Sequence, residues 1–225
     1  MVENEHQLTR ESTQILWLQR ISQIWRLFGT GLSFVLFGIG GLVISLVIFP
    51  SIFVFVRDSD KRQTIARRLM SNAFRTFLFV MKGMGVLAYK IEGAENVKVV
   101  KNQLILANHP TLIDVIFLVS LFPMVECVIK DEITKNPFMR GVVSSANYIP
   151  SKNLSKMLKT CVTRLKAGGS LLLFPEGTRS VPGQPMRFTL GTASVALKSG
   201  AEILPVTIHC DQPRLLSKHE PWYRI

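Results

Sequence analysis

The sequence predicts an α/β domain with a mixed, largely parallel central sheet flanked by helices, preceded by an N-terminal membrane-associated helical segment. Two observations predict the domain: short apolar runs and, between them, stretches with helical periodicity. From Tyr89 onward short apolar runs alternate with stretches of helical periodicity, and strands that alternate with helices are typical of parallel sheets. A third observation predicts the preceding segment, because no charged residue occurs between Arg26 and Arg57. We therefore expect two parts, residues 1–85 and residues 86–225.

The composition narrows the classes of protein to which the chain can belong. Of its 225 residues 48% are hydrophobic and 19% are charged, which excludes a disordered chain and favours a membrane-attached one. The formal net charge is +12, and in so apolar a chain this favours an anionic bilayer surface over nucleic acid as the partner. The three cysteines are far apart without C-x-x-C spacing, so we expect reduced core thiols in a cytosol-facing domain.

The first expected element is an amphipathic helix rich in tryptophan. Its apolar residues recur at helical spacing, while Gln19, Arg20 and Gln23 occupy the opposite side. Such a helix suits the interface of a bilayer. The apolar positions are Trp17, Ile21, Ile24, Trp25 and Phe28.

The uncharged run that follows is 30 residues long, and a membrane span needs about 20. It is long enough to cross a bilayer, and its spare length leaves open a re-entrant hairpin that breaks near Pro50. Residues 1–26 carry no net charge, whereas residues 57–90 carry eight basic and two acidic side chains, a net +6. The positive-inside rule then places the C-terminal side in the cytoplasm.

A second amphipathic helix is expected after the run. Its basic face holds Arg68, Arg75 and Lys82, which either lie on anionic lipid or are solvated while the helix docks on the domain. Its apolar face comprises Phe74, Phe77, Leu78 and Met81.

The globular part is expected to contain four buried strands and three helices. Short apolar runs predict the strands, and apolar residues at i, i+4 and i+7 predict the helices. The expected strands are 103–107, 125–130, 170–174 and 203–208, and the expected helices are 112–121, 154–167 and 192–199.

The first candidate site directly follows strand 103–107. We expect His109 at the cap of the next helix, with Pro110 in its first turn, because active sites of open α/β sheets lie at the carboxyl ends of strands. Asp114 can then reach one imidazole nitrogen and fix the tautomer, while the other nitrogen takes a proton from a substrate hydroxyl. The alternative is a polar capping pair without chemistry. No metal site is expected, because the four histidines lack ligand spacing.

The second candidate site follows strand 170–174 and reads FPEGTRS over residues 174–180. Gly177 permits a tight turn with exposed backbone amides, and Arg179 is a planar cation suited to a phosphate. Glu176 either positions Arg179 or bonds an acceptor hydroxyl. A surface turn with a salt bridge is the alternative, but two polar loops at strand ends favour one shared site.

Together the two blocks resemble signature blocks of the glycerolipid acyltransferases of the 1-acylglycerol-3-phosphate type. The matching residues are His109 and Asp114 in N-H-x-x-x-x-D and the FPEGTRS block, and ILPV at 203–206 is similar to the family's last block. The resemblance covers roughly residues 86–210. It implies that His109 is the catalytic base and Asp114 its partner. It also implies an acceptor-binding block at Glu176, Gly177, Thr178 and Arg179.

Two positions depart from the family pattern. The family's middle block usually ends in an arginine, whereas here Ser151 stands there with Lys152 next to it. Where a Phe-Lys pair is common, this chain has Phe188 and Thr189, with Arg187 before them. We expect Lys152 and Arg187 to bind the acceptor's phosphate in place of the missing charges. A lysine does not replace an arginine at a bidentate site, so an acceptor other than lysophosphatidate remains the alternative.

The resemblance implies a membrane-bound O-acyltransferase. It would move a fatty acyl group from an acyl thioester, either acyl-CoA or acyl carrier protein, to the hydroxyl of a lysophospholipid such as 1-acylglycerol-3-phosphate, with no resident cofactor. We expect it at the bacterial inner membrane with its acyltransferase domain, residues 86–225, on the cytoplasmic side. The alternatives are the same chemistry on another lipid or alcohol, or a non-enzymatic membrane lipid-binding protein.

Overall fold

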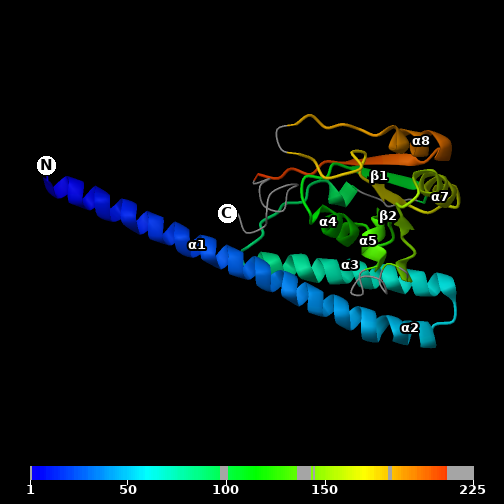
Figure 1. The fold of residues 1–225 in the computed structure, drawn as a ribbon, viewed down its shortest axis with the longest axis horizontal. Helices are drawn as coiled ribbons and strands as arrows, with labels where there is room; N and C mark the ends of the chain where they lie inside the picture. Colours follow the sequence, from blue (N-terminus) through cyan, green and yellow to red (C-terminus); the bar gives the residue numbers. More distant parts are fainter. Residues whose placement is uncertain (1, 97–100, 136–142, 144, 182–183, 212–225) are drawn as a thin grey trace.

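The computed structural model describes the chain except residues 1, 97–100, 136–142, 144, 182–183 and 212–225. Its first feature is one continuous helical rod, in which α1 (Val2–Val43) runs through a short π-helix, η1 (Ile44–Ile48), into α2 (Phe49–Phe55). The chain then turns, and α3 (Ser59–Gly83) returns beside the rod as the second arm of an antiparallel hairpin (Figure 1).

The turn of the hairpin lies after the uncharged run rather than at Pro50. Pro50 is in the first turn of α2, where the change from π- to α-helix accommodates its missing N–H, so the rod continues through it. The turn is fixed by Asp58, whose carboxylate accepts from the amides of Asp60 at 2.9 Å and Lys61 at 3.1 Å. These backbone bonds lower the pKa of the Asp58 carboxyl.

One segment of the rod, Arg20–Phe55, is long and apolar enough to cross a membrane. Along it, exposed apolar side chains recur every three or four residues, which places them on one stripe of the helix. Aromatic side chains on the opposite side contact α3. The stripe comprises Ile21, Ile24, Phe28, Leu32, Val35, Ile39, Val43 and Leu46.

The sheet confirms the α/β prediction, and every described strand pair in it is parallel. The order of its five strands is β3-β2-β4-β1-β5. The strands are β1 (Gln103–Ala107), β2 (Glu126–Ile129), β3 (Ile149–Pro150), β4 (Leu171–Leu173) and β5 (Glu202–Val206). The remaining helical elements are η2 (Ala94–Asn96), α4 (Asp114–Leu121), α5 (Asp131–Lys135), α7 (Leu154–Lys166) and α8 (Leu190–Ser199).

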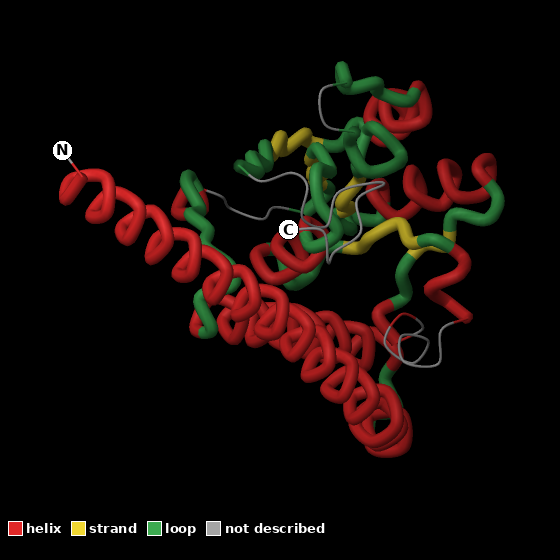
Figure 2. The backbone as a smooth tube through the Cα atoms, turned by 60° about the vertical axis from the view of Figure 1, so that its left-hand side comes forward, coloured by secondary structure: helices red, strands yellow, loops and turns green. Residues whose placement is uncertain are grey.

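Helices cover both faces of the sheet. The helices α3 and α4 lie on one side and α7 and α8 on the other, with the hairpin running along one flank of the molecule (Figures 1 and 2). Neighbouring strand residues point to opposite faces, so Ile105 and Leu172 join a core with Met70 and Phe74 of α3. The alternate strand residues Leu104, Leu171 and Leu173 pack with Cys161 and Leu165 of α7 and Val195 of α8.

The second amphipathic helix docks on the globular part, which resolves the alternative left open by its sequence. All four residues of its predicted apolar face are buried. Ser71 and Arg75 donate to the carbonyl of Ser120 on α4 at 3.2 and 3.0 Å. Basic residues of this helix therefore contact the domain, and the charge that follows the uncharged run is only partly available to a bilayer.

A buried ion network joins α3 to the sheet and to α7. Glu126 on β2 is 5% exposed and accepts from two arginines. Arg67 of α3 lies 2.8 Å from Glu126 Oε1, and Arg164 of α7 lies 3.0 Å from Oε2. Arg67 Nε also donates to the carbonyl of Ala146 at 3.1 Å. Arg67, one of the basic residues counted after the uncharged run, therefore forms a buried ion pair inside the protein.

The structure corrects several predicted boundaries. The helix expected at 112–121 begins only at Asp114, and the helix expected at 192–199 begins two residues earlier, at Leu190. The strands expected at 125–130 and 170–174 are each shorter than predicted. The short elements β3 and α5 were not predicted. The boundary at residue 85 between two domains remains a prediction.

Candidate active site

The site begins at the carboxyl end of β1 with a histidine–aspartate pair. His109 Nδ1 lies 2.8 Å from Asp114 Oδ2. Because a carboxylate only accepts, Nδ1 carries the hydrogen and the lone pair of the neutral ring is on Nε2. The predicted pair is therefore formed in the geometry that leaves Nε2 as a base.

The approach to α4 differs from the predicted one. His109 is not the cap of the helix, and Pro110 is not in its first turn, because the cap is Ile113. The physical reason is the Asp114 carboxylate, which accepts from Thr111 N at 2.7 Å and from Thr111 Oγ1 at 2.5 Å. These bonds fold residues 110–113 into a turn that brings the imidazole back over the start of the helix.

Burial and stacking hold the imidazole in one orientation. The side chain of Asp114 is 2% exposed and that of His109 is 15% exposed. The His109 ring stacks on Phe174, with centroids 4.1 Å apart and an interplanar angle of 21°. Phe174 follows β4, the strand next to β1, so the sheet order itself places this aromatic platform under the base.

Glu176 connects the two polar loops. Its Oε1 accepts from the backbone N of His109 at 3.1 Å and from Ser180 Oγ at 2.9 Å. The backbone N of Ser180 in turn donates to His109 O at 2.8 Å. The two loops predicted to share one site are therefore joined through two hydrogen bonds, a third lies within the second loop, and Glu176 acts on the backbone that carries the imidazole.

The turn at Gly177 requires glycine. Its φ of +68° is left-handed, a conformation that L side chains rarely adopt, and an added Cβ would lie 3.4 Å from Thr189 Cγ2. Thr189 is held there because its backbone N donates to Pro175 O at 2.7 Å. The segment that leads into α8 is thereby fastened to the second loop.

The predicted cationic residues lie at different distances along the sheet edge. Arg179 is half-buried beside Thr178 in the loop that bonds to His109. Arg187 is exposed and lies two residues before the anchored Thr189. Lys152 is exposed beyond the end of β3, which is three strands from β1, or about 14 Å along the edge. Arg187 is thus better placed than Lys152 to reach an acceptor near His109.

Sequence reasoning missed several positioning residues. Thr111, Phe174 and Ser180 all stood inside the two motifs: Thr111 binds Asp114 within its own motif, whereas Phe174 and the backbone N of Ser180 contact His109 in the other motif. Asn108 likewise extends the pairing of β1 and β5 with its side chain, accepting from Ile208 N at 2.7 Å and donating to Ile208 O at 2.8 Å. The only sequence signal for these residues was that they stood beside the charged ones.

Metal ligation and cysteine chemistry find little support within the described part of the chain. No group of three or more histidine, cysteine or acidic side chains there could hold a metal ion. Cys127 and Cys161 are buried thiols, as predicted. Burial raises the pKa of Cys127 to about 12 and that of Cys161 to about 11, which keeps both protonated at neutral pH.

Fold and site together define a class of protein: a parallel α/β sheet that presents a carboxylate-bound histidine beside an arginine-bearing loop at its strand ends. A family model described as Acyltransferase matches residues 88–209, more than half of the chain. The chain belongs to this acyltransferase family.

Two curated relatives of this chain are named for the same activity. The chloroplastic 1-acyl-sn-glycerol-3-phosphate acyltransferase LPAT1 of Arabidopsis thaliana is 32% identical over 124 residues, which cover 52% of this chain and 35% of that protein. The 1-acyl-sn-glycerol-3-phosphate acyltransferase of Pseudomonas aeruginosa is 28% identical over 152 residues, covering 65% and 59%. The chain therefore spans only part of the length of these relatives.

A solved structure shares the fold. The crystal structure of the 1-acyl-sn-glycerophosphate (LPA) acyltransferase PlsC from Thermotoga maritima matches with a TM-score of 0.63 at 24% identity, covering 88% of this chain and 80% of that one. At this identity the likeness is one of fold. It includes most of the N-terminal hairpin as well as the sheet, because the match covers more of the chain than the globular part alone.

Proposed function

We propose that this chain is a membrane-bound O-acyltransferase that moves a fatty acyl group from an acyl thioester to the hydroxyl of a lysophospholipid such as 1-acylglycerol-3-phosphate. The observation that carries the proposal is the 2.8 Å contact between His109 Nδ1 and Asp114 Oδ2, which leaves Nε2 as a base. The names of the curated relatives support the choice of acceptor.

The chemistry needs only groups that the site holds. His109 Nε2 takes the proton of the acceptor hydroxyl as its oxygen attacks the thioester carbonyl, and Asp114 stabilises the imidazolium that forms. A carbon–oxygen bond forms, the carbon–sulfur bond breaks, and the thiolate leaves with the bonding electrons. The proton then passes from His109 to the thiolate or to solvent. A thiol pKa of about 8.5 makes strong acid assistance unnecessary.

The acceptor's charged group is proposed to lie against Arg179, with Arg187 next along the same loop. Arg179 projects from the segment that Glu176 and Ser180 tie to His109, so a phosphate on it would hold a nearby hydroxyl close to the base. Lys152 remains a proposed contact only for a larger headgroup, since its strand is remote from β1.

Attachment to the membrane is proposed to occur through the rod lying in the plane of the bilayer surface. Its exposed apolar stripe faces away from α3, while α3 is fixed to α4 over the sheet. A rod that crossed the bilayer along Arg20–Phe55 would draw the charged α3 into the hydrocarbon with it, which is costly. Lying in the plane avoids that cost, and we propose the cytoplasmic face of a bacterial inner membrane.

The test uses the full chain reconstituted in vesicles that contain phosphatidylglycerol. Labelled acyl-CoA and acyl carrier protein donors are each offered with 1-acylglycerol-3-phosphate, a lysophospholipid of a different headgroup and a long-chain alcohol. We expect transfer to the first acceptor, lowered about 10²–10⁴-fold in His109→Ala. The matched control is His209→Ala, which alters an exposed histidine beyond β5.

Three other outcomes would change the proposed base, the proposed acceptor or the proposed activity. Near wild-type transfer by His109→Ala removes the base from this role. Faster transfer to another acceptor keeps the chemistry and replaces the substrate. Saturable binding of lysophospholipid without transfer from either donor would make the chain a lipid-binding protein instead.

A further inference from the structure

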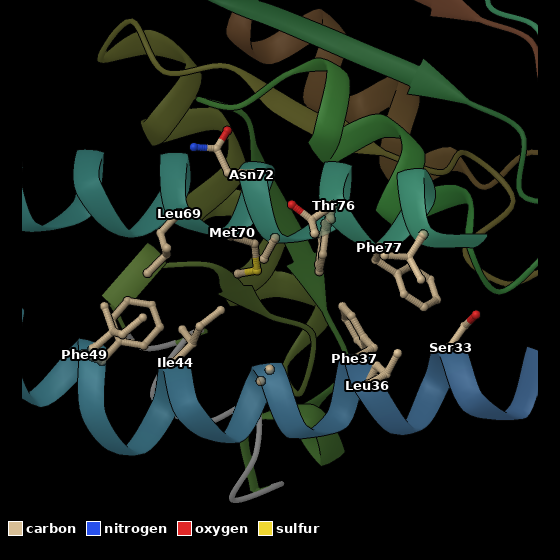
Figure 3. Close-up of a pocket in the computed structure, with 16 residues that line it drawn as sticks. Ser33, Leu36, Phe37, Ile44, Phe49, Leu69, Met70, Asn72, Thr76 and Phe77 are labelled. Carbon is tan, nitrogen blue, oxygen red and sulfur yellow. The ribbon is translucent and has the colours of Figure 1, made fainter. Parts of the chain in front are cut away.

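A cavity of about 370 Å³ separates the middle of the rod from α3. Figure 3 shows Phe37, Ile44 and Phe49 reaching from the rod toward Leu69 and Met70 of α3 across this space. Its size falls in the range of about 300–1,000 Å³ typical of small-molecule sites. It lies outside the catalytic loops, and the proposed acyl transfer makes no use of it.

Two local features keep this space open: an aromatic contact between the helices at one end and, further along the rod, a glycine followed by a π-helix. At one end the helices touch through aromatic rings, with the centroids of Phe37 and Phe77 4.7 Å apart. One turn further on, the rod has Gly40 facing the cavity, and an added Cβ there would meet no atom within 4 Å. The π-helix η1 follows immediately and widens the helix. The gap is therefore built from local sequence features and is more than a loose fit between two helices.

The lining selects an apolar ligand. Of the described residues that line the cavity none is charged, and its three polar members are Ser33, Asn72 and Thr76. Ser33 Oγ already donates a hydrogen bond to Gly29 O at 2.7 Å. The Asn72 amide points away from the rod in Figure 3. The occupant is thus a hydrocarbon, because a polar ligand would find few hydrogen-bond partners there.

The position of the cavity favours a bilayer chain over the reacting acyl chain. Among the described residues its walls come only from the rod and α3. The far side of α3 carries Ser71 and Arg75, which bond to α4, so α3 stands between the cavity and His109. The near side belongs to the rod, whose outer stripe is apolar and exposed. Hydrocarbon therefore reaches the cavity from the bilayer side.

We propose that this cavity binds one acyl chain of a bilayer phospholipid, which fills the space between the rod and α3. A dry void leaves the atoms that line it without contacts on one side, and a hydrocarbon chain restores them. The proposal rests on membrane attachment through the rod but not on acyl transfer by His109, so the two can fail separately.

The test is photolabelling of the full chain in phosphatidylglycerol vesicles doped with a phospholipid that bears a diazirine near the end of one acyl chain. We expect wild-type protein to carry label on the cavity wall of α3, around Ala73, as well as on the outer stripe. Gly40→Leu should lower the α3 label about tenfold, since the new side chain occupies the chain's space. Gly38→Leu is the control, because Gly38 also has room for a side chain but does not line the cavity.

The outcomes separate the alternatives. Ala73→Phe fills the cavity from the other wall and should reproduce the loss if Gly40→Leu does not fold. Co-sedimentation with vesicles reports attachment for every variant. The proposal is overturned if sedimenting wild-type protein carries label on the outer stripe alone, or if Gly38→Leu and Gly40→Leu lose the α3 label equally. An acyl-CoA with the same diazirine that labels Ala73 equally well would assign the cavity to the substrate.

Discussion

At the scale of single residues, the site depends on a buried carboxylate, that of Asp114, whose two oxygens both accept hydrogen bonds. The Asp114 side chain is 2% exposed, and such burial is unfavourable for a carboxylate without partners. Three donors offset the cost: the His109 ring, the Thr111 amide and the Thr111 hydroxyl. The same three bonds define the turn before α4, so the carboxylate orients the base and shapes the loop that carries it.

Glu176 is predicted to position the base rather than to bind the acceptor. Its Oε1 accepts from His109 N and Ser180 Oγ, and a neutral amide oxygen can accept the same two bonds. We therefore expect Glu176→Gln to keep most of the rate and Glu176→Ala to lower kcat about 10²-fold, with the KM for the acceptor little changed in either. Steady-state kinetics with varied acceptor is the measurement. A large rise in KM for Glu176→Gln would show that the carboxylate binds the acceptor directly.

The cysteines give a prediction about reactivity. Because burial raises the pKa of Cys127 to about 12 and of Cys161 to about 11, both remain protonated thiols at pH 8, where the thiolate is the reactive form. Cys210 is only partly buried. We expect N-ethylmaleimide at pH 8 to modify Cys210 alone in the native protein and all three thiols after denaturation, as read by mass spectrometry. Label on native Cys127 would contradict the buried position of β2, and Cys210→Ser should remain unlabelled.

At the scale of elements, strands and helices with a regular apolar pattern were predicted from the sequence. Boundaries that depend on a single side-chain contact were not. Strand β1 was predicted at its observed boundaries because four of its five residues, Leu104 to Ala107, form an unbroken apolar run typical of a buried strand. The start of α4 was misplaced because side-chain bonds of Asp114 overrule the preference of Pro110 for a first helical turn. Strand β3 has two residues and leaves no pattern to detect.

In the candidate active site, too, sequence motifs were predicted and contacts set by the fold were not. His109, Asp114 and the loop at Glu176 were predicted because the chemistry requires those residue types at the ends of neighbouring strands. The stacking of Phe174 on His109 and the bond from Ser180 N to His109 O could not be predicted, since they depend on the order of β1 and β4 in the sheet. That order is set by the whole fold.

The ion network at Glu126 is expected to be the main polar tie between the hairpin and the sheet. Glu126→Gln would leave the buried guanidinium group of Arg67 and the partly buried one of Arg164 without a counter-charge, and breaking a buried pair costs about 3–5 kcal/mol. Both side chains are less than one third exposed. Denaturant unfolding in detergent, followed by circular dichroism, measures the loss. The control Glu132→Gln, on exposed α5, should change stability by less than about 0.5 kcal/mol. Equal stability of the two variants would show that packing alone fastens α3.

At the scale of the whole molecule, one series of contacts connects the helical rod to the candidate active site. The rod presents its apolar stripe outward, α3 fastens it to α4, and α4 begins at Asp114. The rod that we propose to lie on the bilayer is therefore only one helix away from Asp114. In the arrangement that we propose, a rod lying in the plane keeps the site at the surface from which a lysophospholipid would arrive.

The orientation of the rod is open to a direct measurement. In a Cys210→Ser background, Gln23→Cys and Ser59→Cys place exposed thiols at opposite ends of the apolar segment. With the globular part outside the vesicles, a rod in the plane exposes both thiols to the outer solution, whereas a crossing rod hides Gln23→Cys in the lumen. We therefore expect a membrane-impermeant maleimide to label both variants equally before detergent is added.

Ser59→Cys supplies the internal reference, because its position at the start of α3 keeps it on the side of the globular part in either arrangement. Only vesicles whose Ser59→Cys protein is fully labelled from outside are scored, which fixes the sidedness of the reconstitution. Labelling of Gln23→Cys that appears only after detergent would establish a crossing rod. In that case α3 would have to separate from α1 over the length of the bilayer, and the contact between Phe37 and Phe77 would not persist in the membrane.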